Sequence, residues 1–149
     1  MKINSKPITI LMADDDPDDR LLVQEAFEEN RLMNELATVE DGEELMDFLH
    51  RKGKFVDTQI TPGLILLDLN MPRKSGLEAL REIKADQKLR RLPVVILTTS
   101  KAEEDIIRSY DLGVNSFIVK PVTFEALVEL IKEIDKYWFQ IVELPKFAE

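Results

Sequence analysis

Short apolar runs recur along the chain at intervals that suit buried β-strands. Four of them span residues 8–13, 64–67, 94–97 and 116–119, and residues 36–40 are a weaker fifth candidate. The runs do not alternate between apolar and polar residues, which is typical of strands that are buried on both faces. The pattern therefore predicts a sheet with other structure packed on both sides.

Between the runs, apolar residues repeat at intervals of three and four, as on one face of an amphipathic helix. The sets are Leu22/Val23/Ala26/Phe27, Leu45/Met46/Phe48/Leu49, Leu77/Leu80/Ile83, Ile106/Ile107/Tyr110 and Phe124/Leu127/Val128/Ile131/Ile134/Trp138. Strand and helix patterns thus alternate about five times. Because strand-helix-strand crossovers are right-handed, this order predicts an α/β fold, a doubly wound five-stranded parallel sheet with helices on both faces.

Residues that begin and end helices agree with this order. Pro17 suits a first helical turn, Ser75 and Thr123 can cap two later helices, and Gly113 can close the fourth. Residues 53–63 form the one long loop. The sequence has no repeats, low-complexity segments or interdomain linkers, so we expect a single domain over residues 1–149 without an output domain.

Composition excludes several kinds of site. The 149 residues include no cysteine and a single histidine, His50, so a disulfide framework, a thiolate metal site and a histidine-rich zinc site are excluded. Residues 1–7 lack the apolar core of a signal peptide, and no apolar run approaches the roughly 18 residues of a membrane span. We expect a soluble, cytoplasmic protein that makes no contact with membranes.

The formal net charge of −9 argues against nucleic-acid binding, which needs a basic surface to displace counterions. Lys88, Arg90 and Arg91 form one local basic cluster. We interpret this cluster as the solvated end of a helix before Pro93, and we expect no nucleic-acid partner.

Polar residues stand at the ends of the apolar runs. They are Asp14, Asp15, Asp68, Thr98 and Lys120. Parallel strands end at one edge of their sheet, and ligands of open α/β folds bind there. Two carboxylates about 4 Å apart repel by roughly 4 kcal/mol at an effective dielectric constant of about 20, so the cluster needs a cation. Mg²⁺ suits an incomplete cage of oxygen ligands.

A carboxylate flanked by Mg²⁺, an ammonium group and a hydroxyl group is equipped to accept a phosphoryl group. Phosphoryl transfer depends mostly on positioning and charge neutralisation, and an aspartate can serve as the nucleophile. Asp68, Lys120 and Thr98 would be the carboxylate, the ammonium and the hydroxyl group. The residues therefore indicate a phosphoryl-accepting site.

Four ordered motifs resemble the signature of response-regulator receiver domains of two-component signalling. They are Asp14-Asp15, Leu67-Asp68-Leu69-Asn70-Met71-Pro72 with Gly76, Thr98-Thr99, and Lys120-Pro121. The likeness covers residues 8–135 or so and leaves 136–149 as a C-terminal helix extension or tail. It implies a flavodoxin-like (βα)5 fold and a stand-alone phosphoacceptor that catalyses only its own phosphorylation and dephosphorylation.

The resemblance also implies roles for individual residues. Asp68 would be the phosphoacceptor, and the Mg²⁺ ligands would be Asp68, Asp15 directly, Asp14 largely through water, and the backbone carbonyl of Asn70. Lys120 and Thr99 would contact the phosphoryl oxygens, and Thr98 would swing toward them. Phe117 would be the aromatic switch residue, and because it lacks a hydroxyl group it can turn inward without stranding a polar atom.

A narrower likeness concerns three other segments. The loop before Pro62-Gly63-Leu64, the run 97–106 and the ending 137–145 resemble phytochrome-associated response regulators of cyanobacteria and relatives. This implies a sensor histidine kinase, of phytochrome type, as the partner. Phosphorylation would then switch the surface made by the fourth helix, fifth strand and fifth helix.

The aromatic ending has two interpretations. Trp138, Phe139, Ile141 and Val142 follow the helix that should already cover the sheet, and exposed apolar patches often mark partner surfaces. We expect a homodimer through the fourth helix, fifth strand, fifth helix and this extension. The alternative is that the tail folds back onto its own core.

Other acidic residues have a simpler interpretation. Asp16, Asp18 and Asp19 suit the start of a helix, where carboxylates interact favourably with the dipole. A calcium loop is a further possibility, because its positions one, three, five and twelve would be Asp14, Asp16, Asp18 and Glu25. However, Asp19 stands where that loop needs glycine, and Pro17 breaks it. We therefore leave Asp16, Asp18 and Asp19 outside the site.

Two further functions fit the same fold. A turnover phosphohydrolase would use Asp68 as its nucleophile, but such enzymes commonly have a second aspartate two residues later, where this chain has Asn70. A flavin-binding module would need a phosphate loop rich in Ser, Thr and Gly after the first strand, where Asp14, Asp15 and Asp16 would repel phosphate.

Overall fold

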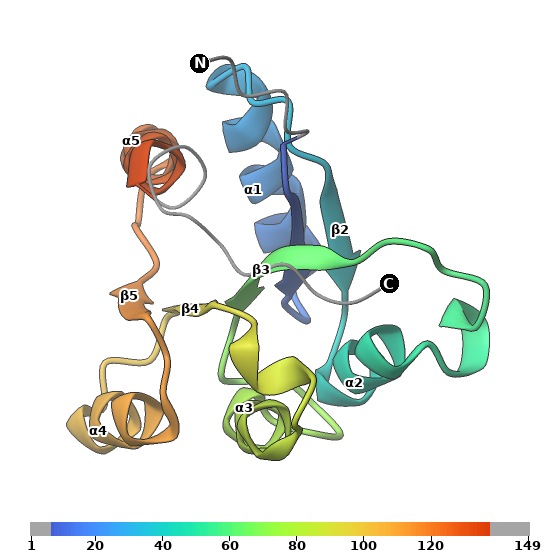
Figure 1. The fold of residues 1–149 in the computed structure, drawn as a ribbon. Helices are drawn as coiled ribbons and strands as arrows, with labels where there is room; N and C mark the ends of the chain where they lie inside the picture. Colours follow the sequence, from blue (N-terminus) through green and yellow to red (C-terminus); the bar gives the residue numbers. More distant parts are fainter. Residues whose placement is uncertain (1–6, 138–149) are drawn as a thin grey trace, which may run out of the picture.

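Five parallel strands form one sheet in the order β2-β1-β3-β4-β5 in the computed structural model, which describes residues 7–137 (Figure 1). Their bounds are β1 Thr9–Ala13, β2 Leu36–Val39, β3 Pro62–Leu67, β4 Val94–Thr98 and β5 Ser116–Val119. Every neighbouring pair is parallel. The predicted parallel sheet is confirmed, including the weaker strand candidate at residues 36–40.

Helices follow each of these strands and cover both faces of the sheet. Their bounds are α1 Pro17–Glu29, α2 Gly42–His50, α3 Gly76–Ala85, α4 Glu103–Leu112 and α5 Phe124–Ile134, with two 3-10 turns, η1 Gly53–Phe55 and η2 Leu89–Arg91. Figure 1 shows α1 and α5 on one face and α2, α3 and α4 on the other. The doubly wound, flavodoxin-like arrangement is thus present.

The apolar runs are explained by two separate cores. Ile10 and Met12 of β1 pack with α1 and α5 residues on one face. Leu11 and Ala13 of the same strand pack with α2 and α3 residues on the other. Because side chains of a strand point alternately to its two faces, a strand with a core on each side must be apolar at every position.

Helix ends match the predicted signals. Asp16 caps α1 by accepting a hydrogen bond from the N–H of Asp18. Ser75 forms a capping box with Glu78 at α3, and Thr123 caps α5. Gly113 closes α4 in the left-handed conformation, with φ of 101°, which a glycine adopts without steric cost.

Three sequence-based expectations need correction. The loop at 53–63 is not wholly irregular, because it contains η1 and because β3 begins at Pro62, which pairs with Thr9. The basic cluster does not end a helix, since α3 stops at Ala85 and Arg90 and Arg91 lie in the separate turn η2. The predicted apolar face of α4 is only partly covered, with Ile107 and Tyr110 about half exposed.

Two further expectations concern membrane spans and the C-terminal extension. Within residues 7–137 there is no helix whose length and apolar character would let it cross a membrane. Trp138 and Phe139, which we expect at a dimer interface, lie outside the described residues. The role of the C-terminal extension in a dimer therefore stays a prediction.

Candidate functional site

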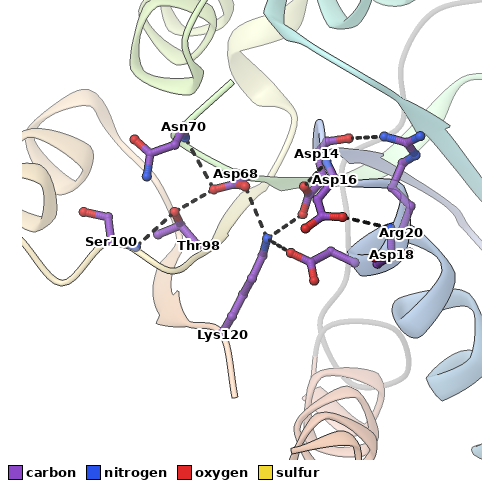
Figure 2. Close-up of polar contacts among 10 residues, drawn as sticks. Asp14, Asp16, Asp18, Arg20, Asp68, Asn70, Thr98, Ser100 and Lys120 are labelled. Carbon is purple, nitrogen blue, oxygen red and sulfur yellow. Dashed lines mark hydrogen bonds and ion pairs between the residues drawn. The ribbon is translucent and has the colours of Figure 1, made fainter. Parts of the chain in front are cut away.

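The ends of three strands bring Asp14, Asp68 and Lys120 into contact (Figure 2). Asp14 follows β1, Asp68 follows the adjacent β3, and Lys120 follows β5. The ammonium group of Lys120 lies 2.6 Å from Oδ2 of Asp14 and 3.2 Å from Oδ2 of Asp68. The meeting of these strand ends, predicted from the pattern of apolar runs, is confirmed.

The Asp68 carboxylate is nearly buried and has a different partner at each oxygen. The hydroxyl group of Thr98, at the end of β4, donates a hydrogen bond of 2.6 Å to Oδ1, and the N–H of Asn70 lies 3.4 Å from the same oxygen. Oδ2 faces Lys120. The carboxylate is thus held between a hydroxyl group and an ammonium group.

Three carboxylates at this edge can share one cation. Asp14, Asp15 and Asp68 each offer an oxygen, and these oxygens lie within 4.8 Å of one another. Asp14 and Asp68 are buried, whereas Asp15 is exposed to solvent. An oxygen-only set that leaves one side open suits a hard divalent cation that keeps several waters, so these residues fit the expected metal.

Charge at the site also favours a cation. Burial alone would lower the pKa of Lys120, but hydrogen bonds to Asp14 and Asp19 and the charges of Asp14 and Asp68 raise it well above its ordinary value. Lys120 therefore stays an ammonium group at neutral pH. Burial raises the pKa of Asp14 above its ordinary range, although Lys120 and the N–H of Asp16 act in the opposite direction. The ammonium group of Lys120 alone therefore does not fully compensate the negative charge of the buried Asp14 carboxylate.

Asp19 belongs to this cluster, contrary to its interpretation as a solvated helix-start residue. Its Oδ2 lies 2.7 Å from the Lys120 ammonium group. Asp16 and Asp18 are exposed, and Asp16 caps α1, so the interpretation is right for those two. Asp19 and Lys120 lie 101 positions apart in the sequence, so no local spacing identifies this contact.

Arg20 is a second residue that sequence reasoning missed. Its Nη1 donates a hydrogen bond of 2.6 Å to the backbone carbonyl of Asp14 (Figure 2). This bond ties the start of α1 to the end of β1. A backbone acceptor leaves no trace in the sequence, so the pattern of residue types could not reveal it.

The loop between β3 and α3 is fixed to the start of α2. Arg73 donates two hydrogen bonds to Oδ2 of Asp41, at 2.8 and 2.6 Å, and the Gly42 N–H donates to the carbonyl of Lys74. Burial alone would raise the pKa of Asp41, but the N–H of Glu44 and the guanidinium of Arg73 lower it below its ordinary value. These bonds hold the loop that follows Asp68, and sequence reasoning missed both Asp41 and Arg73.

The remaining predicted site residues lie around this cluster. Asn70 is exposed and directs its backbone N–H at Asp68, while Thr99 is an exposed residue after β4. Phe117 in β5 is partly buried and packs against the core on the α2–α3–α4 face. Its backbone N–H donates to the hydroxyl group of Tyr110, at 3.1 Å.

Comparison with known proteins decides the family. Residues 10–132 match the model of the response regulator receiver domain. The chain belongs to this family. Receiver domains are phosphoacceptor signalling proteins, so the two alternatives, a turnover phosphohydrolase and a flavin-binding module, are set aside.

Individual relatives of this receiver domain cover almost its whole length. Response regulator Rcp1 of Synechocystis sp. is 40% identical over 95% of this chain and 96% of its own. The crystal structure of the Mn²⁺-bound form of Rcp1 has a TM-score of 0.86 at 41% identity, covering 94% of this chain and 100% of that one. The phosphorylated cyanobacterial phytochrome response regulator RcpA has a TM-score of 0.88 at 41% identity, with coverages of 95% and 100%.

Proposed function

We propose that this receiver domain takes a phosphoryl group from a phosphohistidine of a sensor histidine kinase onto Asp68. The observation that carries the proposal is the position of the Asp68 carboxylate, between the Thr98 hydroxyl group at 2.6 Å and the Lys120 ammonium group at 3.2 Å. An aspartate in that setting is both shielded and flanked by groups that bind anionic oxygens.

The transfer is a displacement at phosphorus. One oxygen of Asp68 forms a bond to phosphorus, the P–N bond of the phosphohistidine breaks, and its electron pair stays with the imidazole nitrogen. Lys120 then donates to the phosphoryl oxygens, and Thr98 and Thr99 supply hydroxyl groups beside them. The chain's part is to position the carboxylate and to neutralise charge, which is what phosphoryl transfer requires.

We propose Mg²⁺ as the cofactor, held by Asp14, Asp15, Asp68 and the backbone carbonyl of Asn70. A divalent cation there would neutralise negative charge on the phosphoryl oxygens. Support comes from the three carboxylates within 4.8 Å and from Rcp1, whose structure was solved in a Mn²⁺-bound form. Asp14 also keeps its hydrogen bond from the Asp16 N–H, which orients the carboxylate.

The response to phosphorylation would pass through Thr98 and Phe117. A phosphoryl group adds roughly 1.5 to 2 negative charges, which draw the Thr98 hydroxyl group toward it. Thr98 is the last residue of β4. Phe117 lies on the neighbouring strand β5, where it pairs with Ile96 of β4. We propose that Phe117 turns inward as Thr98 moves, so that β5 and α4 change together.

The surface that changes would be the one made by α4, β5 and α5. Ile107 and Tyr110 on α4 and Val119 on β5 expose much of their apolar side chains. The N-cap position of α4 is Ala102, which gives no side-chain hydrogen bond, and the start of this helix is held instead by the Ser100 hydroxyl group, which donates to Asp105 at 2.7 Å. We propose that a homodimer forms here, with Trp138 and Phe139 contributing.

We propose a phytochrome-type kinase as the phosphoryl donor, because RcpA and Rcp1 are similar along nearly the whole chain. The donor must bring its imidazole group to Asp68, so it must cover the surface beside Lys120. A small cavity of about 60 Å³ lies there, lined partly by Leu22 and Val122, which are both exposed. These apolar side chains suit contact with a kinase domain.

Phosphotransfer from a labelled kinase tests this function. A phytochrome-type kinase that has phosphorylated its own histidine is mixed with this protein, with Asp68→Asn, and with His50→Gln. We expect label to move to the wild-type chain and to His50→Gln, in a base-labile form typical of an acyl phosphate, and not to Asp68→Asn. Label that is kept in Asp68→Asn, or that does not reach the wild-type chain, would contradict the proposal.

Sedimentation tests the dimer separately. We expect the phosphorylated wild-type chain to sediment as a dimer and Ile107→Glu as a monomer, because a charge on the α4 surface would oppose burial. A variant truncated before Trp138 tests the extension. A dimer mass unchanged by that truncation would rule out a role for the tail.

A further inference from the structure

The ammonium group of Lys120 is bonded to three carboxylates at once. Its nitrogen lies 2.6 Å from Oδ2 of Asp14 and 3.2 Å from Oδ2 of Asp68 (Figure 2). It also lies 2.7 Å from Oδ2 of Asp19. A lysine ammonium group has three N–H donors and no acceptor. Its hydrogen-bonding capacity is therefore filled by these three partners.

Two of the three partners have other roles in the proposed function. Asp14 and Asp68 belong, with Asp15, to the set of carboxylates that can share a cation, and Asp68 would also carry the phosphoryl group. Asp19 lies outside that set, on the first turn of α1. Of these three carboxylates, Asp19 alone contacts Lys120 without being needed by the cation or the phosphoryl group.

The first turn of α1 holds Asp19 in a fixed place. Pro17 stands at the start of the helix and Asp16 caps it, so the backbone there is restrained. The Asp19 side chain is about one third exposed, whereas the Lys120 side chain is largely buried. A lysine side chain is flexible and has many rotamers, so a fixed partner reduces the conformational entropy that Lys120 loses when it contacts a phosphoryl oxygen.

We propose that Asp19 is a positioning residue for Lys120. It keeps the ammonium group beside Asp68 when the cation and the phosphoryl group engage Asp14 and Asp68. It also eases cation entry, because the ammonium group can withdraw from Asp14 without losing an anionic partner. The inference rests on the proposed function of Asp68 and adds to it a residue on α1.

A pair of adjacent substitutions tests this role. Asp19→Asn and Asp18→Asn remove the same charge from the same helical turn, but Asp18 is exposed and lies outside the Lys120 contacts. Two quantities are measured on the full chain, the dissociation constant of Mn²⁺ by electron paramagnetic resonance and the rate of phosphorylation by acetyl phosphate. Thermal unfolding of both variants reports any structural effect.

We expect Asp19→Asn to weaken Mn²⁺ binding and to slow phosphorylation by roughly three- to tenfold beyond Asp18→Asn, as suits one charge-assisted hydrogen bond. Asp19→Glu keeps the charge and should restore part of the Mn²⁺ affinity and part of the phosphorylation rate. The nitrogen resonance of the Lys120 ammonium group should shift in Asp19→Asn and stay in place in Asp18→Asn, an effect that lost helix stability would not produce.

Two results would overturn the inference, and they can be told apart. The first is that Asp19→Asn and Asp18→Asn have equal Mn²⁺ dissociation constants and equal phosphorylation rates, while the wild-type chain is phosphorylated on Asp68. This result would remove Asp19 from the site and leave the proposed function unaffected. A wild-type chain that gains no phosphoryl group would remove the function of Asp68 and the role of Asp19 together.

Discussion

The hydroxyl group of Thr98 donates a hydrogen bond of 2.6 Å to Oδ1 of Asp68, and both side chains are buried. The same hydroxyl oxygen accepts from the Ser100 N–H at 3.3 Å. Thr98 thus links the acceptor carboxylate to the segment that leads into α4. We propose that this link carries the change from Asp68 to the α4–β5–α5 surface.

Replacing Thr98 separates phosphorylation from the response to it. Thr98→Ala removes a hydrogen bond to a charged group, so we expect the free energy of unfolding to fall by about 2 kcal/mol. Asp68 remains, so acetyl phosphate should still phosphorylate the variant, but sedimentation should show no dimer. Thr98→Ser keeps the hydroxyl group and is the control. Equal loss of dimer in the Ala and Ser variants would argue against the hydroxyl group as the link.

At neutral pH, Asp14 should stabilise the fold only when a cation is bound. Its pKa is raised in the folded state above the ordinary 3.8. Its contribution to stability is therefore present below pH 3.8 and is lost as the pH rises through the folded pKa. At pH 7 with a chelator, we expect Asp14→Asn to raise the free energy of unfolding by about 1 kcal/mol, because a carboxylate that burial disfavours as an anion is removed while Lys120 keeps Asp19 and Asp68.

Magnesium should reverse that order. At about 100 times its dissociation constant, Mg²⁺ should stabilise the wild-type chain by about 2.7 kcal/mol. The gain should be much smaller for Asp14→Asn and should be retained in Asp18→Asn. Thermal unfolding with and without Mg²⁺ measures both effects, and an Asp14→Asn variant that gains as much as wild type would exclude Asp14 from the metal site.

Asp41 has the opposite pH dependence. Its pKa is lowered in the folded state below 3.8, so its contribution is present above pH 3.8 and is lost as the pH falls through the folded pKa. At pH 7 we expect Asp41→Asn to cost about 2 kcal/mol, because hydrogen bonds to a charged group are weakened. Urea unfolding from pH 7 to pH 3 should show this difference shrink as the pH falls.

Glu43 is the control for Asp41. It is exposed and lies 3.7 Å from Nε of Arg73, so its ion pair is weak. Glu43→Gln should leave stability nearly unchanged at every pH. A cost for Asp41→Asn that stays constant down to pH 3 would show that the carboxylate charge is not what fixes the loop.

Gly76 leaves no room for a side chain beside the acceptor. A Cβ there would lie 2.2 Å from the carbonyl oxygen of Asp68 and 2.7 Å from Cα of Leu69. We expect Gly76→Ala to cost about 3 kcal/mol in unfolding and to slow phosphorylation by acetyl phosphate, because the backbone of Asp68 must move. At Gly53 the nearest atom lies 3.8 Å away, so Gly53→Ala should cost only its backbone strain and leave the rate unchanged.

The pattern of residues predicted the sheet and the positions of Asp14, Asp68, Thr98 and Lys120 because these features depend on local periodicity. A buried strand is apolar throughout, and the carboxyl ends of parallel strands all lie at the same edge of the sheet. The same reasoning located the caps at Ser75 and Thr123, since a cap interacts with its own helix.

Contacts that depend on side-chain reach could not be predicted in this way. Asp19 meets Lys120 across 101 positions of sequence, and Asp41 meets Arg73 across 32. The apolar pattern of α4 indicated a face but not whether it is covered, and Ile107 is half exposed. Periodicity shows which side of a helix is apolar, whereas its burial depends on what packs against it.

Intact mass after incubation with acetyl phosphate and Mg²⁺ tests the central claim most directly. We expect the wild-type chain to gain one phosphoryl group and Asp68→Asn to gain none, because Asp68 is the carboxylate held between Thr98 and Lys120. An adduct of one phosphoryl group that survives in Asp68→Asn would contradict the assignment of the acceptor.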